Sequence, residues 1–375
     1  GLSSTWAPSC LYLLTPVFLL LPLLPWVLNF EFVIWKDVGL AYSWLLAVAL
    51  ALHIHEREKA SLPWFAAAAL FFTYGLLVRG NSLFGGVLLA PFLMSCMWKG
   101  GKRRTFAVAA LCCALAWGVL PKAFNFLVRA EVTKPMAYVM FDDVAALTLA
   151  GVQLDPPYFS EAESQGLRRC LQLIVHQIGA PFCLPARFEE SRRNGYPALR
   201  AAWTQGLMRG FSDYLGHRWS AFLTLIRSPV VSPYYYKDFR VPVGPKYDFD
   251  SRLAAPTANE SAAVSMVEKM AAYLPGVFKP YVWIVLSIVT TVLLRHQSRE
   301  GPEFWMLPLS GAAYALSYLP FTPAGDFRYV YWTCLITTVG MMIWLARLPS
   351  GKIFTSVRNS YTATFAWKRA TRDRR

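Results

Sequence analysis

Residues 62–98 read LPWFAAAALFFTYGLLVRGNSLFGGVLLAPFLMSCMW, and Arg79 is the only charged residue among them. About 20 consecutive apolar residues cross the hydrocarbon core of a bilayer as an α-helix. This stretch is long enough for two such helices, and Arg79-Gly80-Asn81 near its middle marks the turn between them. It predicts a tight transmembrane hairpin, which a soluble single domain would not contain.

Apolar runs of similar length lie on both sides of this hairpin. Together they predict eight spans, at residues 10–29, 34–53, 62–78, 80–98, 105–121, 278–294, 304–321 and 327–346. The composition agrees, because 55% of the 375 residues are hydrophobic and 16% are charged, against about 25% charged in soluble domains. The predicted fold class is therefore all-α, a polytopic transmembrane helical bundle.

The distribution of lysine and arginine predicts the orientation of the bundle, because cytoplasmic loops are enriched in these residues. The segments on one side of the predicted spans carry 16 basic residues, eight of them in the tail 347–375. The short segments on the opposite side carry five, which are Lys36, Arg79, Lys122, Lys279 and Arg328. The tail is therefore predicted to be cytoplasmic, and residues 122–277 are predicted to lie on the far side.

Four regions follow from these spans. They are spans one to five in 1–121, a non-cytoplasmic domain in 122–277, spans six to eight in 278–346 and a basic cytoplasmic tail in 347–375. The non-cytoplasmic segment is nearly neutral, because it carries 16 basic and 14 acidic residues between Arg129 and Lys269. Helical periodicity recurs along it and no alternating strand pattern is visible, so it is predicted to be helical, with amphipathic helices suited to a membrane surface.

The net charge of +15 does not indicate nucleic-acid binding. The basic excess lies in short loops between apolar runs and in the tail, as in a cytoplasmic membrane face. No Walker, GxSxG or GxGxxG motif occurs, so nucleotide-binding folds and serine hydrolases are not indicated either.

Most of the seven cysteines lie inside apolar runs, where cysteine acts as a small packing residue. Cys170 and Cys183 lie instead in the polar segment. A disulfide between them requires an oxidising compartment and a close approach of their Cα atoms, which the sequence leaves open. His176 and His217 lie in predicted helices without the paired spacing of a metal site, so neither is assigned as a ligand.

The chain starts at Gly1 without a basic region, and the apolar run Leu11–Asn29 is followed directly by further spans. A cleaved signal peptide has a basic start before a short apolar region. The sequence therefore predicts no such peptide, and the chain is interpreted as the C-terminal part of a longer protein.

Charged residues within or beside membrane spans are costly to place and are candidates for function. Four polar groups lie at span ends, and the predicted orientation puts all four on the far side. They are Trp35-Lys36-Asp37-Val38, Arg79-Gly80-Asn81-Ser82, Asp142-Asp143 and Asp326-Phe327-Arg328-Tyr329. The cytoplasmic span ends have no comparable clusters of acids and bases. The four groups together predict one functional face.

Each group alone also has a simpler structural explanation. Lys36 and Arg79 are long enough to reach the membrane interface from a span end. Asp142 and Asp143 fit the first turn of a helix, where acids are favoured, and Tyr329 fits an interfacial aromatic belt. The functional hypothesis therefore depends on the four groups acting together.

The residue types in these groups suit chemistry on a lipid-linked phosphate. The candidate catalytic residues are Asp37, Asp142 and Asp143, because a carboxylate acts as a general base. Lysine and arginine bind phosphate groups, arginine with paired N–H groups. The candidate substrate-binding residues are Lys36, Arg79, Asn81, Asp326, Arg328 and Tyr329. Carboxylates are also compatible with a divalent metal ion, although no metal ligand is assigned and the cofactor stays unknown.

Four motifs follow one another along the chain, IWKDV at 34–38, LLVRGNSLFGGVLLA at 76–90, FDDVAALTLAG at 141–151 and AGDFRYVYW at 324–332. In this order they resemble a group of bacterial polytopic membrane proteins placed near the GT-C superfamily of glycosyltransferases. Residues 201–219, AAWTQGLMRGFSDYLGHRW, are similar to a helix in the outer domain of that group. The resemblance covers most of the chain, and within each quoted stretch the matching motif is only three to five residues long.

This resemblance implies a multi-pass protein of a bacterial inner membrane, with residues 122–277 in the periplasm. It implies a glycosyltransferase that takes a sugar from a polyprenyl-phosphate donor and modifies an envelope glycan or lipid acceptor. The positions that match are Lys36, Asp37, Arg79, Asn81, Asp142, Asp326, Arg328 and Tyr329. The chain departs from the pattern at Gly80, where the group often has histidine. It also lacks the first outer loop that usually carries a catalytic aspartate, which implies that these residues alone form an incomplete enzyme.

Two other functions stay open. A flippase or transporter for a lipid carrier also binds a phosphate head group, but transporters typically show internal repeats and charges near the membrane midplane. Here no repeat is detectable and the charges lie at span ends. A non-catalytic membrane scaffold is the third hypothesis, and the lack of the first outer loop favours it.

Overall fold

The computed structural model describes residues 21–28, 36–56, 62–97, 102–128, 134–173, 179–227, 258–297, 303–323, 325 and 327–347. Within these residues the chain is helical and has no β-strand, which confirms the predicted all-α class. Most of the first predicted span and nearly all of the basic tail lie outside the described residues.

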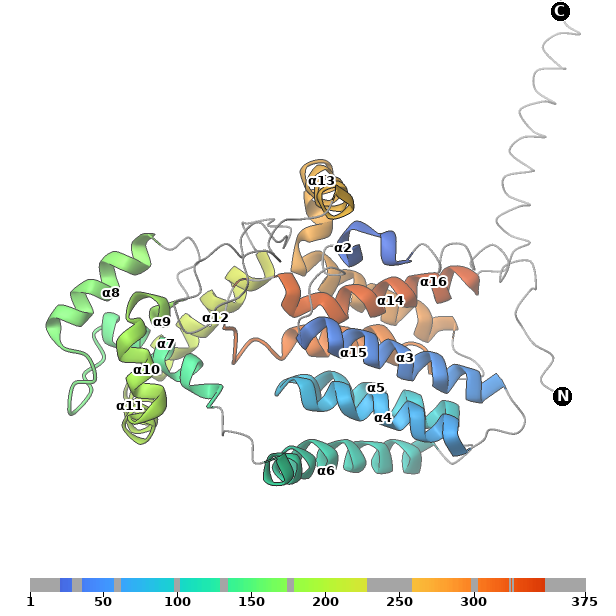
Figure 1. Cartoon of the computed structure of the whole chain (residues 1–375), viewed down its shortest axis with the longest axis horizontal. Coiled ribbons are helices and arrows are strands. Elements are labelled where there is room, and N and C mark those ends of the chain that lie inside the picture. The colour runs from blue at the N-terminus through green and yellow to red at the C-terminus, as the bar shows by residue number, and fades with distance from the viewer. Residues whose placement is uncertain are drawn as a thin grey trace, which may run out of the picture.

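A bundle of aligned helices forms the larger part of the described structure (Figure 1). Its helices are α3 (Lys36–Glu56), α4 (Leu62–Val78), α5 (Ser82–Met97), α6 (Lys102–Val128), α14 (Pro280–Gln297), α15 (Met306–Leu316) and α16 (Tyr331–Ala346). Helices α3, α4, α5 and α6 pack in sequence, and α15 connects α5 to α14 and α16. Two short elements, η1 (Leu21–Leu23) and α2 (Pro25–Leu28), precede the bundle, and α2 contacts α16.

Several bundle helices have the length and composition of membrane spans. Among the described residues, three stretches are long and apolar enough to cross a membrane: Lys36–His55, Phe106–Ala123 and Phe327–Ala346. Shorter apolar helices cover Leu62–Val78, Ser82–Met97 and Met306–Leu316. The helices are thus consistent with a membrane protein, and the number of eight spans stays a prediction.

Trp44 of α3 lies at the centre of the bundle and is fully buried. Its ring lies 6.1 Å from Phe72, 6.3 Å from Tyr314 and 5.1 Å from Trp332, measured between ring centroids. The indole N–H donates to the carbonyl of Phe72 at 3.1 Å, so the buried donor is satisfied. Helix α4 approaches closely because it has Gly75 there, where a Cβ would lie 2.3 Å from the Trp44 indole nitrogen.

We therefore expect Gly75→Ala to destabilise the bundle, because an extra methyl group in a close-packed core costs about 1–3 kcal/mol. Gly118→Ala in α6 is the matched control, since a Cβ at Gly118 meets no other atom within 4 Å. Thermal unfolding of the purified protein in detergent measures the difference. Equal melting temperatures for the two variants would contradict the packing of α3 against α4.

A second group of helices, which we call the cap, lies beside one end of the bundle (Figure 1). It comprises α7 (Met136–Leu149), α8 (Glu161–Leu173), α9 (Ala180–Cys183), α10 (Pro185–Arg193) and α11 (Tyr196–Arg209). The cap has its own hydrophobic core, built around Phe141, Val144 and Leu199. Its residues fall within the predicted helical segment 122–277, and the side of the membrane that it faces stays a prediction.

Helix α12 (Phe211–Arg227) joins the two cores. Its first half contacts α7 and α11 of the cap, and its second half contributes Phe222 and Leu225 to the bundle core. Figure 1 shows α12 leading from α7 toward α14. The return to the bundle runs through α13 (Ala258–Tyr273) and η4 (Pro275–Phe278). The cap is therefore attached to the end of the bundle where α14 begins.

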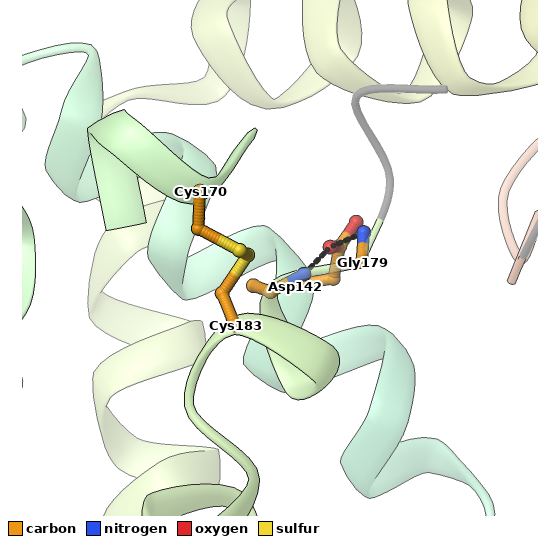
Figure 2. The surroundings of a disulfide bond; sticks show 5 residues. Asp142, Cys170, Gly179 and Cys183 are labelled. Carbon is orange, nitrogen blue, oxygen red and sulfur yellow. Dashed lines mark hydrogen bonds between the residues drawn. A yellow bond between two sulfur atoms is a disulfide. The ribbon is translucent and has the colours of Figure 1, made fainter. Parts of the chain in front are cut away.

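A disulfide joins α8 to α9 within the cap (Figure 2). Cys170 and Cys183 are bonded, with their Cα atoms 5.7 Å apart, so the pairing that the sequence left open is present. Helix α8 starts at a capping box, because Ser160 N–H donates to Glu163 at 2.8 Å and Glu163 N–H donates to the Ser160 hydroxyl at 3.3 Å. Disulfides persist in oxidising compartments, which supports the prediction that this segment lies outside the cytoplasm.

Candidate functional site

Four of the predicted site residues meet at the end of the bundle where α3 begins. Asp37, in the first turn of α3, is buried and forms an ion pair with Arg79, which directly follows α4. Tyr314 of α15 donates to the other carboxylate oxygen of Asp37 at 3.4 Å. We call Asp37, Arg79, Arg328 and Tyr329 the bundle cluster.

Both arginines of the bundle cluster lie over the ring of Tyr329, which belongs to η5 (Phe327–Val330). The guanidinium carbon is 5.3 Å from the ring centroid in Arg79 and 5.0 Å in Arg328. Arg328 also donates to the Tyr329 hydroxyl at 3.0 Å. Cations over an aromatic face are attracted by its electron density. The ring of Tyr329 therefore attracts two guanidinium groups, one from the turn after α4 and one from η5.

The remaining substrate-binding candidates differ in their placement. Asn81, just before α5, donates to the Ser317 hydroxyl at 3.0 Å and thereby links α5 to the end of α15. Lys36 is exposed at the start of α3. Asp326 lies outside the described residues. The structure thus brings Arg79, Arg328 and Tyr329 together and leaves Lys36 at the surface of the same end.

Asp142 and Asp143, both on α7 of the cap, are buried and bind different partners. Asp142 Oδ1 accepts hydrogen bonds from the backbone N–H groups of Gly179 and Ala180, each at 3.0 Å (Figure 2). Its Oδ2 lies 3.1 Å from Nε2 of His217 on α12. Gly179 has a φ of +155°, which residues with a side chain rarely adopt, so glycine suits this position before α9.

Asp143 forms a buried ion pair with Arg218, which directly follows His217 on α12. Its Oδ1 accepts the Arg218 Nε–H at 2.6 Å, and its Oδ2 accepts the indole N–H of Trp203 at 2.8 Å. Arg218 also donates to the carbonyls of Val139 at 3.0 Å and Thr322 at 3.2 Å. We call Asp142, Asp143, His217 and Arg218 the cap cluster.

The two aspartates of the cap cluster differ in pKa. Burial by itself raises the pKa of Asp142, but the hydrogen bonds from His217 and the Ala180 N–H outweigh it and hold the pKa below its ordinary value. Burial dominates at Asp143 and raises its pKa, although Arg218 and His217 oppose the change. Neighbouring carboxylates whose pKa values are pushed apart are a feature of acid–base sites.

The bundle cluster and the cap cluster lie close to each other. Tyr138 is one turn before Asp142 on α7, and burial, the charge of Asp142 and the nearby Tyr329 all raise the pKa of its hydroxyl. Arg218 of the cap cluster provides a second connection, because it donates to the carbonyl of Thr322. Thr322 comes shortly before η5 in the sequence, and η5 contains Tyr329. Cations from the bundle and an acid–base group from the cap therefore share one end of the structure.

Sequence reasoning missed His217 and Arg218 as members of the site. A signal existed, because Arg218 shares a helix face with Tyr214, Ala221 and Leu225, which the periodicity of α12 assigns to the interior. An arginine at an interior position needs an acidic partner, since buried charges are almost always paired. The informative residue in the sequence is therefore Arg218, the neighbour of His217.

Comparison with known proteins assigns no family, because no family model, no curated protein and no solved structure matches the chain. Among the residues that the structure describes, no group of three or more histidine, cysteine, aspartate or glutamate side chains is arranged to hold a metal ion. The function is therefore argued from the two clusters themselves.

Proposed function

We propose that the protein is a membrane transferase that moves a sugar from a polyprenyl-phosphate donor to an envelope glycan or lipid, at the periplasmic face of a bacterial inner membrane. The observation that supports this most is the juxtaposition of the cationic bundle cluster with the acid–base cap cluster. The order of the four sequence motifs, which resembles GT-C glycosyltransferases, is a second support.

The bundle cluster is suited to a phosphate group. Arginine N–H groups bind phosphate oxygens in pairs. Arg79 lies in the turn after α4 and Arg328 lies in η5, just before the last helix, yet both guanidinium groups lie over the ring of Tyr329. When the bond between sugar and phosphate breaks, the leaving phosphate gains negative charge, which fixed cations stabilise. Lys36 is exposed at the same end and adds a third cation to the surroundings.

Apolar surface suited to a polyprenyl chain lies beside Arg79. Trp117 of α6 donates its indole N–H to the carbonyl of Gly80 at 3.0 Å, which places α6 against the turn after α4. Large apolar side chains on both helices are exposed near that turn, among them Leu77, Trp117 and Leu120. A lipid tail along these side chains would bring its phosphate to the bundle cluster.

The predicted roles of the three aspartates as general bases stay predictions. In Asp37 and Asp143 the carboxylate already pairs with an arginine, and this favours a supporting role in which each holds a cation in position. Asp142 instead contacts His217, so acid–base chemistry in the cap cluster centres on that pair.

The proposal predicts that Arg328→Gln lowers kcat/KM for the donor by about tenfold or more, because a hydrogen bond to a charged group contributes about 1.5–3 kcal/mol. The assay incubates membranes containing the full chain with labelled polyprenyl-phosphate sugars and follows transfer of the label. Arg295→Gln is the matched control, since Arg295 also lies over an aromatic ring, 5.3 Å from the Trp305 centroid, but at the opposite end of the bundle.

Three results would argue against the transferase. They are no transfer by the wild-type protein, equal loss in both arginine variants, and unchanged cell-envelope glycans when Asp37 and Asp142 are replaced by alanine. Movement of the lipid head group across proteoliposomes without covalent change would identify a flippase instead. A stable partner protein without either activity would identify a scaffold.

A further inference from the structure

His217 differs from a surface histidine in how its ring is held. Its side chain is 16% exposed, and Nε2 lies 3.1 Å from Oδ2 of Asp142 and 3.8 Å from Oδ1 of Asp143. A neutral imidazole that donates its Nε2–H to a carboxylate carries its lone pair on Nδ1. The pairing with Asp142 therefore fixes both the orientation of the ring and the nitrogen that accepts a proton.

The carboxylate that orients His217 is itself rigidly held. Asp142 is buried, and its Oδ1 accepts two successive backbone N–H groups, those of Gly179 and Ala180. Hydrogen bonds from N–H groups favour the ionised form of a carboxylate, and a nearby negative charge favours protonation of an imidazole. Asp142 is therefore suited to stabilise the imidazolium that forms when His217 takes up a proton.

The other charged and titratable groups near His217 are already engaged or are not bases. From α7 these are Asp143 and Tyr138, and from α12 they are Arg218 and Tyr214. Asp143 binds Arg218 and Trp203, and burial raises the pKa of both tyrosine hydroxyls. Among these neighbours, His217 is the group with the geometry of a general base.

We infer that His217 is the general base of sugar transfer and that Asp142 is the residue that positions it, an inference that rests on the proposed function. The acceptor hydroxyl gives its proton to Nδ1 while its oxygen forms a bond to the anomeric carbon of the sugar. The bond from that carbon to the phosphate oxygen breaks, and its electron pair leaves with the polyprenyl phosphate. The imidazolium then releases its proton to solvent, and Arg79 and Arg328 balance the charge on the phosphate.

The test compares transfer rates of His217→Ala, His217→Gln and the control His55→Ala, which changes an exposed histidine at the other end of α3. A general base typically contributes about 10²–10⁴-fold, so we expect a loss of at least a hundredfold in both His217 variants. The KM for the donor should change less than about threefold, because the bundle cluster binds the phosphate. Added imidazole should restore part of the rate of His217→Ala.

The pH dependence separates the role of a base from a purely structural one. Protonation of a base produces a fall in rate at acid pH, and this fall should disappear in His217→Gln. Asp142→Asn keeps an oxygen for the two backbone N–H groups but removes the negative charge beside the imidazole. In that variant we expect a slower reaction, because the imidazole loses the carboxylate that orients it.

A measurement without substrate tests the pair itself. The rate at which diethyl pyrocarbonate modifies His217 at a fixed pH, followed by peptide mass spectrometry, should be higher in Asp142→Asn than in the wild type, because the ring is no longer held by the carboxylate. An unchanged modification rate overturns the pairing. If the wild type transfers sugar and His217→Ala is as fast as His55→Ala, the base assignment is overturned. If the wild type transfers nothing while the modification rate differs between the two proteins, the proposed function fails and the pair remains a positioned base without that reaction.

Discussion

Replacing Arg218 with methionine is expected to lower the stability of the folded protein by about 3–5 kcal/mol, because removing one partner of a buried ion pair leaves the other charge uncompensated. Arg218 is 2% exposed and Asp143 is fully buried. In the variant, Asp143 keeps only Trp203 as a close donor, and the carbonyls of Val139 and Thr322 lose theirs. The Thr322 bond is also one of the links between the cap and the bundle.

Arg209→Met is the matched control for this prediction. Arg209 donates to the carbonyl of Gln153 at 2.8 Å, but it is exposed, so its loss should change stability by about 0.5 kcal/mol or less. Unfolding in detergent, followed by heat or denaturant, measures both. Adding Asp143→Asn to Arg218→Met should recover part of the loss, because the buried charge is removed. An Arg218→Met protein as stable as Arg209→Met would show that the pair does not support the fold.

The bundle was largely predictable from sequence because its signal is local. The hairpin around Arg79 was predicted as spans 62–78 and 80–98, and α4 ends at Val78 while α5 begins at Ser82. Helix boundaries were less predictable where the helix outlasts its apolar run. The span predicted at 105–121 lies within α6, but α6 also includes Lys122 and continues to Val128.

The grouping of site residues was predictable only in part. The charge pattern placed Asp37, Arg79 and Arg328 at one end of the bundle, and the structure brings Asp37 and Arg79 into contact across 42 positions of sequence. The contact between Asp142 and His217 spans 75 positions and depends on how α7 packs against α12, which no local pattern encodes. The sequence does not determine the disulfide for a similar reason, since its formation depends on how α8 packs against α9.

Reduction of the Cys170–Cys183 disulfide is expected to slow the proposed sugar transfer by about tenfold or more while leaving the bundle folded. Helix α9 is only four residues long, and it ends at Cys183 and follows Gly179, so one short element carries both the disulfide and the N–H groups that bind Asp142 (Figure 2). A disulfide closing a loop of this length contributes about 3 kcal/mol by restricting the chain. Without it, α9 is held less firmly, and the carboxylate that orients His217 loses part of its fixed support.

The measurement compares oxidised and dithiothreitol-treated wild type with the double variant Cys170→Ser and Cys183→Ser. The double variant should be slow in both conditions, whereas Cys112→Ser, which changes an exposed free cysteine, should behave as the wild type. Hydrogen exchange at the Gly179 and Ala180 amides gives a readout that needs no substrate, because reduction should speed their exchange. Equal exchange before and after reduction would mean that the hydrogen bonds to Asp142 hold α9 without help from the disulfide. If exchange becomes faster while the transfer rate is unchanged, the N–H groups that bind Asp142 are not needed to orient His217 for the reaction.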